Sequence, residues 1–172
     1  MAAQIVNFSL DVLDTMEYRI VDDADDNNFQ GQNVVCKYVI PDDFRSPANS
    51  MSLMGYNIRA MKTNWDNFST ELYNGIIACD FLGFCETHLT NATESLYALE
   101  GYNFFSSNVT SNKGGVCLYA RNDFNCKLRK DLISVDEHIE TIFIECRINN
   151  RNLTVGMLYH RPGTSSERFF GP

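Results

Sequence analysis

The chain has few of the features that mark disorder, membrane spans or secretion. Only four of its 172 residues are proline and 44% are hydrophobic, which is the composition of one ordinary globular domain. No run of about 20 apolar residues occurs, so we expect no membrane span and no membrane partner. The first residues carry no basic cluster and acquire acids early, unlike a signal peptide. We therefore expect an intracellular protein, in the nucleus or the cytoplasm.

Two kinds of short motif are also missing. None of the six cysteines forms a C-x-x-C pair and most sit in apolar runs, so we predict reduced, buried thiols. Neither G-x-x-x-x-G-K-[ST] nor G-x-G-x-x-G is present, which excludes the common phosphate-binding loops. The segment 113–115, Lys-Gly-Gly, is therefore predicted to be a tight connection.

Basic residues are in the minority, and the acidic excess lies at one end. Residues 1–50 carry nine acidic and three basic side chains, whereas residues 51–172 carry 13 and 11. This balance does not indicate the basic patch typical of nucleic-acid binding. It does not exclude such binding, because a cation beside a phosphate needs local carboxylates. We predict that residues 1–50 form an acidic, largely disordered tether, followed by one domain over 51–172.

Strand and helix patterns succeed each other from residue 51 onward. An apolar strand over 52–59 precedes a helical repeat over 64–78, with Asn64 as its expected N-cap, and then an apolar strand over 80–86. This order predicts a βαβ unit with parallel strands. The remaining strand candidates are 102–108, 115–123 and 126–132, and a hairpin formed by 139–148 and 152–161.

Three polar side chains stand at the ends of predicted strands: Asn57, Glu86 and Tyr159. The first two close parallel strands, whose carboxyl ends share the sheet edge where α/β proteins place ligand sites. Taken singly, each has an ordinary explanation as a turn former, a cap or a core residue. A carboxylate after a buried strand is nevertheless costly unless something pairs with it. Together, the three side chains predict a site at this edge.

Short motifs surround these residues in a fixed order. They are N-I-R, N-x-D-N-F, D-F-x-G-x-x-E-T-x-L, L-x-G-Y, G-G-V-x-L-Y, I-E-x-I-F-I-E, and V-G-x-L-Y followed by R-P. In this order they resemble the endonuclease/exonuclease/phosphatase superfamily, and more narrowly the apurinic-type endonuclease domain of non-LTR (LINE-type) retrotransposons, which accompanies a reverse transcriptase. The resemblance implies an α/β fold, part of a DNase I-like four-layer sandwich truncated to roughly the first sheet and its helices.

The resemblance also implies an activity, a Mg²⁺-dependent phosphodiesterase that nicks DNA, with Mn²⁺ as a substitute cation. Glu86 would hold the metal, Asn57 would orient the site, and Tyr159 would donate its hydroxyl to a phosphate oxygen. Basic side chains beside these positions would contact the nucleic-acid backbone: Arg59, His160 and Arg161. The chain departs from the usual pattern of that family at two of these places. Many relatives carry Asp where Arg59 stands, and they have Y-R-P-P where this chain has Y-H-R-P.

Two later motifs of that family, G-D-F-N and a terminal S-D-H, do not occur in the chain. His88 and His138 are predicted to be surface residues and do not replace the catalytic histidine. Because hydrolysis needs a group that activates water, we expect a truncated N-terminal portion that does not cleave DNA alone. Thr164 and Glu167 are spaced as a capping box for a further helix. A single sheet with an uncovered inner face would favour self-association.

Other interpretations stay open at this point. The alternative is a decayed or domesticated fragment that binds nucleic acid or protein without catalysis. A different substrate within the same superfamily is the third alternative: an abasic site in repair, a phosphoinositide or sphingomyelin.

Overall fold

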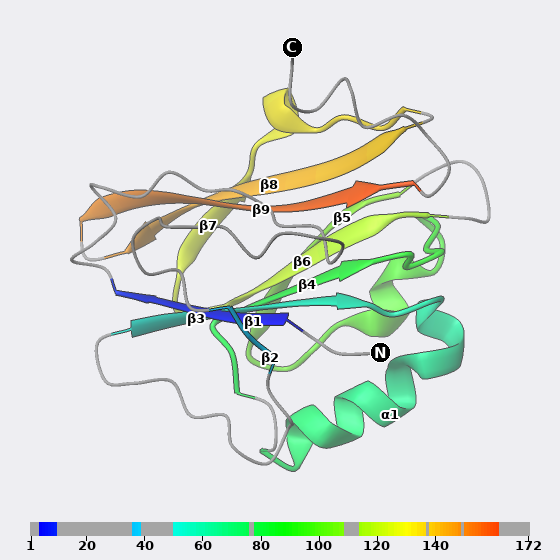
Figure 1. Cartoon of the computed structure of the whole chain (residues 1–172), viewed down its shortest axis with the longest axis horizontal. Helices are drawn as coiled ribbons and strands as arrows, with labels where there is room; N and C mark the ends of the chain where they lie inside the picture. Colours follow the sequence, from blue (N-terminus) through cyan, green and yellow to red (C-terminus); the bar gives the residue numbers. More distant parts are fainter. Residues whose placement is uncertain are drawn as a thin grey trace, which may run out of the picture.

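The computed structural model describes residues 4–9, 36–38, 50–75, 78–108, 114–136, 138–148 and 150–161. These residues form a mixed α/β fold of two β-sheets and one α-helix (Figure 1), which agrees with the predicted α/β class. The elements in chain order are β1 (Gln4–Ser9), β2 (Cys36–Tyr38), β3 (Ser50–Asn57), α1 (Met61–Tyr73), β4 (Phe81–Cys85), the 3₁₀ turn η3 (Glu94–Tyr97), β5 (Tyr102–Ser107), β6 (Val116–Arg121), β7 (Asn125–Leu128), the 3₁₀ turn η4 (Lys130–Leu132), β8 (Ile139–Ile148) and β9 (Arg151–His160).

The larger sheet has the strand order β2-β1-β3-β4-β6-β5, and only β3 and β4 run parallel in it. The predicted βαβ unit is therefore confirmed as β3–α1–β4. The strands β1 and β2 come from the segment predicted as a tether, and apart from Ser50, which begins β3, its other residues lie outside the described ranges. The smaller sheet has the order β7-β8-β9, and its β8–β9 pair is the predicted hairpin.

The register places several chain segments at one edge of the larger sheet. Asn57 at the end of β3 pairs with Cys85 at the end of β4, and Cys85 in turn pairs with Val116 at the start of β6. Val116 also pairs with Ser107, the last residue of β5. The connections that follow β3, β4 and β5 therefore all leave the sheet at this edge.

One hydrophobic core lies between α1 and the outer face of the larger sheet. Trp65 and Phe68 of the helix stack at 5.8 Å between ring centroids, and both rings contact Phe84 of β4 edge-on. Trp65 also stacks on Tyr119 of β6. The 3.6-residue spacing of the apolar helix positions thus matches an aromatic face of the sheet.

A second core lies between the two sheets, and it corrects the expectation of a single sheet with an uncovered face. Phe81 and Leu118 from the larger sheet are fully buried together with Ile142 and Ile144 of β8. The two sheets approach closely at Gly83 of β4, where a Cβ would lie only 3.0 Å from Met157 Sδ of β9. The reason for the difference is that the β8–β9 hairpin pairs with β7 instead of extending the first sheet, so it covers that sheet's face.

The helix begins earlier than predicted, at Met61, and Asn64 is not its N-cap. The N-cap position is held by Ala60, which makes no side-chain capping bond. Asn64 lies inside the first turn, and its amide donates to the carbonyls of Ile58 (2.8 Å) and Arg59 (3.0 Å). Its side chain thus stabilises the preceding loop. The helix also ends earlier than predicted, at Tyr73.

The cysteine prediction holds for three thiols and fails for one pair. Cys79, Cys85 and Cys117 are buried and reduced. Cys126 of β7 and Cys146 of β8 are directly opposite in the antiparallel register and form a disulfide. The pairing register, which local sequence does not reveal, is what brings these two sulfur atoms together.

Two further predictions concern the strand over 126–132 and the helix at Thr164. The strand expected over 126–132 is shorter, because β7 ends at Leu128 and a 3₁₀ turn follows. The helix expected to begin at Thr164 falls outside the described residues. Within the described part of the chain, no helix is long and apolar enough to cross a membrane.

Candidate functional site at the carboxyl edge of β3, β4 and β9

The strands β3, β4 and β9 point toward the same edge of the molecule in Figure 1. Asn57 is the last residue of β3, Glu86 directly follows β4, and Tyr159 lies one residue before the end of β9. Glu86 Oε1 accepts hydrogen bonds from Asn57 Nδ2 and from the Tyr159 hydroxyl, both at 2.7 Å. These three residues, called the Glu86 cluster below, therefore join the two sheets at this edge.

The Asn57 side chain has a fixed orientation. Its Oδ1 accepts a hydrogen bond from the Arg59 backbone amide at 3.1 Å, while its Nδ2 donates to Glu86. The two bonds together distinguish the amide oxygen from the amide nitrogen. Asn57 thus holds both the loop after β3 and the Glu86 carboxylate.

The backbone beneath Glu86 is held in an uncommon conformation. Glu86 has a φ of 53° and Arg59, in the neighbouring loop, has a φ of 49°. Left-handed conformations in residues other than glycine persist when surrounding contacts impose them. Three backbone bonds between the loops do so: Ile58 N to Cys85 O (3.1 Å), Ala60 N to Glu86 O (2.7 Å) and Met61 N to Thr87 O (3.0 Å).

The donors on the Glu86 carboxylate are neutral, and both bind the same oxygen. An amide and a phenol satisfy Oε1. Within the described part of the chain, no basic side chain pairs with Glu86 and no donor reaches its Oε2. The carboxylate is half-buried, and neither of its two donors carries a charge that would compensate it. Such a group attracts a cation to its second oxygen.

The environment of Tyr159 keeps its hydroxyl protonated. Burial raises the pKa of the Tyr159 phenol well above its ordinary value of 10.0, and the hydrogen bond to Glu86 raises it further. The hydroxyl therefore stays a hydrogen-bond donor at neutral and mildly alkaline pH.

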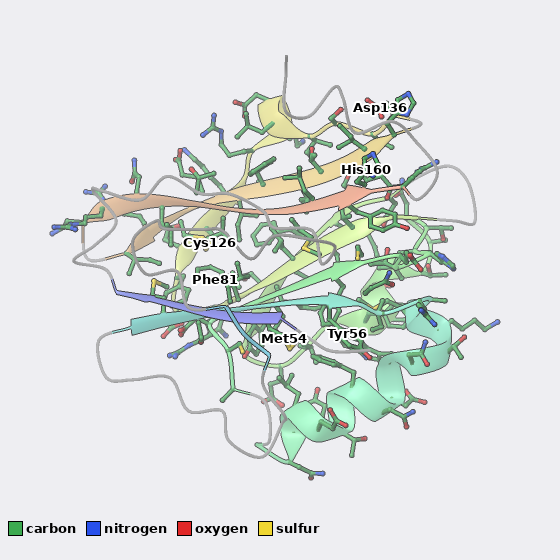
Figure 2. All side chains as sticks on the ribbon, in the orientation of Figure 1. Met54, Tyr56, Phe81, Cys126, Asp136 and His160 are labelled. Carbon is green, nitrogen blue, oxygen red and sulfur yellow. A yellow bond between two sulfur atoms is a disulfide. The ribbon has the colours of Figure 1, made fainter. Side chains whose placement is uncertain are left out.

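The side chains predicted to contact nucleic acid lie around this cluster in different settings. Arg59 is exposed on the loop after β3, and His160 is half-buried at the end of β9 (Figure 2). Arg161 is instead engaged inside the protein, because its Nε donates to Glu140 Oε1 at 2.8 Å. The nucleic-acid contacts stay a prediction for all three residues.

Two histidines were predicted to be surface residues. His88 is exposed, as predicted, and has a φ of 54° just after the Glu86 position. His138 differs from the prediction, because it is half-buried and its Nδ1 is shielded from solvent. The backbone amide of His138 is also held in place, because it donates a hydrogen bond to Asp136 Oδ1 at 2.7 Å.

Sequence reasoning missed Glu140, which is 0% exposed and lies opposite Tyr159 in the β8–β9 register. The missed signal was one acid at an inward position of the mostly apolar stretch IETIFI. A lone acid in a strand is normally assigned to the solvent face. Glu140 is buried because the two sheets pack against each other, which local sequence does not reveal.

The residues at this edge fit a cation that needs few protein ligands. Within the described residues, no group of three or more His, Cys, Asp or Glu side chains could hold a metal ion. This excludes a closed, all-protein cage formed by those residues. Mg²⁺, however, usually binds through one or two carboxylates and keeps several waters. Within the described residues, Oε2 of Glu86 accepts no hydrogen bond and could supply one such ligand.

Comparisons with known proteins add no identification. No protein-family model matches the chain, and no curated protein matches it. The function proposed below therefore depends on the geometry of the Glu86 cluster and on the resemblance described above.

Proposed function

We propose that this chain carries the metal- and phosphate-binding part of a Mg²⁺-dependent phosphodiesterase that nicks DNA, the endonuclease of a non-LTR retrotransposon. One observation carries the proposal: the Glu86 carboxylate is fixed by two neutral donors, Asn57 and Tyr159, at the carboxyl edge of two parallel strands. That arrangement orients the carboxylate without cancelling its charge.

Each residue of the cluster has a distinct task in this proposal. Glu86 would hold Mg²⁺ through Oε2, and the bound cation would supply charge stabilisation at the scissile phosphate. Asn57 keeps the Glu86 carboxylate in one orientation. Tyr159 keeps its proton and is available as a donor to a phosphate oxygen, where developing charge strengthens the bond. When substrate binds, the Tyr159 hydroxyl would weaken its hydrogen bond to Glu86 and donate to a phosphate oxygen instead.

The arrangement of layers supports the proposal that the chain forms part of a DNase I-like sandwich. A helix, a mostly antiparallel sheet and a second sheet lie in that order, which is compatible with part of a DNase I-like four-layer sandwich. The second sheet covers the face through which self-association was expected.

No described residue is assigned the role of activating water. The motifs G-D-F-N and S-D-H are absent from the sequence, and His88 is exposed on a loop. The proposal therefore predicts cation binding as the primary property of this chain and slow hydrolysis by the chain alone. Nicking of supercoiled plasmid in Mg²⁺ measures the second point, and rapid nicking that Glu86→Ala abolishes would contradict it.

Cation binding is tested by calorimetric titration of the chain with Mg²⁺ and with Mn²⁺. Glu86→Gln keeps the size of the side chain and removes its charge, so we expect cation affinity to fall at least about tenfold, or binding to disappear. Glu71→Gln removes an exposed carboxylate from α1 and is the matched control. Equal cation affinity in the two variants would refute the proposed function.

A further inference from the structure

The buried carboxylate of Glu140 connects two segments that the Glu86 cluster depends on. Its Oε1 accepts a hydrogen bond from Arg161 Nε at 2.8 Å, and its Oε2 accepts one from the backbone amide of Gly115. Glu140 is completely shielded from solvent. A buried charge is tolerated only when it is paired and hydrogen-bonded, so both bonds are needed to keep Glu140 in place.

The first connection runs from Glu140 to the loop that carries Glu86. The carbonyl of Gly115 accepts a bond from Thr87 N (3.1 Å), and the carbonyl of Gly114 accepts one from His88 N (2.8 Å). Thus the two residues that follow Glu86 are held by the glycine pair that Glu140 holds. The fit requires glycine, because a Cβ on Gly114 would clash with the Glu140 carboxylate.

The second connection runs from Glu140 to the strand end that carries Tyr159. Arg161 lies just beyond β9, and its backbone amide donates to His138 O at 2.9 Å. Glu140 is also the direct partner of Tyr159 in the β8–β9 register. Figure 2 labels Asp136 and His160 at this edge, where β8 begins and β9 ends. The buried Glu140 side chain therefore connects the end of β9, which carries Tyr159, to the loop that carries Glu86.

We propose that Glu140 is a positioning residue of the Glu86 cluster: with Arg161 and Gly115 it sets the geometry in which Glu86 and Tyr159 meet and in which Glu86 binds a divalent cation. The cation-binding part rests on the proposed function. Glu140 itself does not touch the cation or the substrate. It acts on the backbone of the Glu86 loop and on the end of β9.

The test compares Glu140→Gln with Glu145→Gln in the full chain. Glu145 lies on the same strand and is also paired with basic side chains, with Lys127 at 2.8 Å and with Arg129 at 3.2 Å, but it has no bond to the glycine pair. We expect Glu140→Gln to lower Mn²⁺ affinity about tenfold or more, as loss of an outer support does in metal sites. Glu145→Gln should bind Mn²⁺ within about twofold of the unsubstituted chain. Equal affinity of the two variants would overturn the inference.

A second measurement does not depend on the cation. Hydrogen exchange of the amides of Thr87, His88 and Gly115, followed by mass spectrometry, should become at least about tenfold faster in Glu140→Gln and stay unchanged in Glu145→Gln. If the unsubstituted chain shows no Glu86-dependent cation binding, the proposed function fails, and exchange alone decides on Glu140. Unchanged exchange in Glu140→Gln would then overturn the positioning role.

A fallback variant addresses the case in which Glu140→Gln does not fold. Arg161→Gln breaks the same pair from its half-exposed side and leaves the carboxylate in place. It should raise exchange at Gly115 and lower Mn²⁺ affinity in the same direction. Exchange and affinity equal to those of the unsubstituted chain would overturn the inference.

Discussion

Glu86 accepts hydrogen bonds from two uncharged side chains, and this choice of partners determines what the residue can do. An arginine in the same place would neutralise the carboxylate and complete a structural ion pair. The amide of Asn57 and the phenol of Tyr159 fix the orientation of the carboxylate and leave its charge available. Glu86 is in this respect the opposite of Glu140, whose charge is compensated by Arg161.

Removing the Tyr159 hydroxyl tests how much the cluster contributes to stability. We expect Tyr159→Phe to lower the free energy of unfolding by about 1 kcal/mol, because one part-buried hydrogen bond to a carboxylate is lost. Tyr73→Phe is the control, since Tyr73 is exposed on α1 and should tolerate the change. Urea unfolding of both variants measures the difference, and an equal effect in the two would argue against a stabilising bond at Glu86.

The sequence allowed Asn57, Glu86 and Tyr159 to be singled out because each closes an apolar strand. Strand direction alone places Asn57 and Glu86 at one edge. It does not place Tyr159 there, because that residue belongs to a different sheet and reaches Glu86 only through the contact between the sheets. The same long-range contact buries Glu140, which is why that residue could not be predicted from local pattern.

Among the described connecting elements, the Gly114–Gly115 turn is the one with the least tolerance for a side chain. Gly115 has a φ of 90°, and a Cβ there would clash with the hydroxyl of Thr87, which is itself buried. The sequence predicted a tight connection here without revealing what it approaches. The structure shows that the turn approaches the Glu86 loop.

Gly115→Ala should therefore destabilise the chain more than a glycine substitution with the same backbone cost. Gly101 is the matched control, because its φ is 83° and no atom lies within 4 Å of its potential Cβ. We expect about 1 kcal/mol for Gly101→Ala and about 2–4 kcal/mol for Gly115→Ala, since the second adds a steric clash to the left-handed strain. Urea unfolding gives both values, and equal losses would show that Thr87 yields without cost.

The start of helix α1 shows how a local signal can be correct in chemistry and wrong in position. Asn64 has the short polar side chain of an N-cap, and the sequence pattern placed the helix start there. In the structure its amide bonds to two carbonyls of the preceding loop, and the helix starts three residues earlier, at Met61. The loop that Asn64 holds is the one that follows Asn57.

At the scale of the whole molecule, the second sheet changes the expected behaviour of the chain. A single sheet with one bare face would aggregate, whereas here the apolar faces of both sheets bury each other. Individual strands were predictable from alternating side chains. Which strands share a sheet was not, because the side-chain pattern of a strand does not by itself specify its partner strand.

The buried thiols should make the stability of the whole chain sensitive to alkaline pH. Burial raises the pKa of Cys79 and of Cys85 from 9.0 to about 12, and nearby carboxylates add to the shift. Because the folded state favours the protonated thiols, their contribution is complete below pH 9 and is lost as pH rises toward 12. Thermal unfolding temperatures measured across this range should fall.

A double variant, Cys79→Ala with Cys85→Ala, provides the control for the pH effect. It should be less stable at pH 7 because two buried side chains are truncated, but its unfolding temperature should fall less steeply between pH 9 and 12. Parallel curves for the two proteins would assign the alkaline loss to other groups, such as Tyr102, whose pKa burial also raises to about 12.

For the proposed cation site, the unequal use of the two Glu86 oxygens would have a consequence for ion discrimination. With Oε1 already accepting two hydrogen bonds, a cation can approach Glu86 through one oxygen only. Large ions such as Ca²⁺ often take both oxygens of a carboxylate, and here they would have to displace Asn57 and Tyr159 to do so. Smaller ions that bind one oxygen and retain their water shell meet no such obstacle. In the proposed cation site, the two neutral donors would thus act as a size filter on the cation as well as a support for the carboxylate.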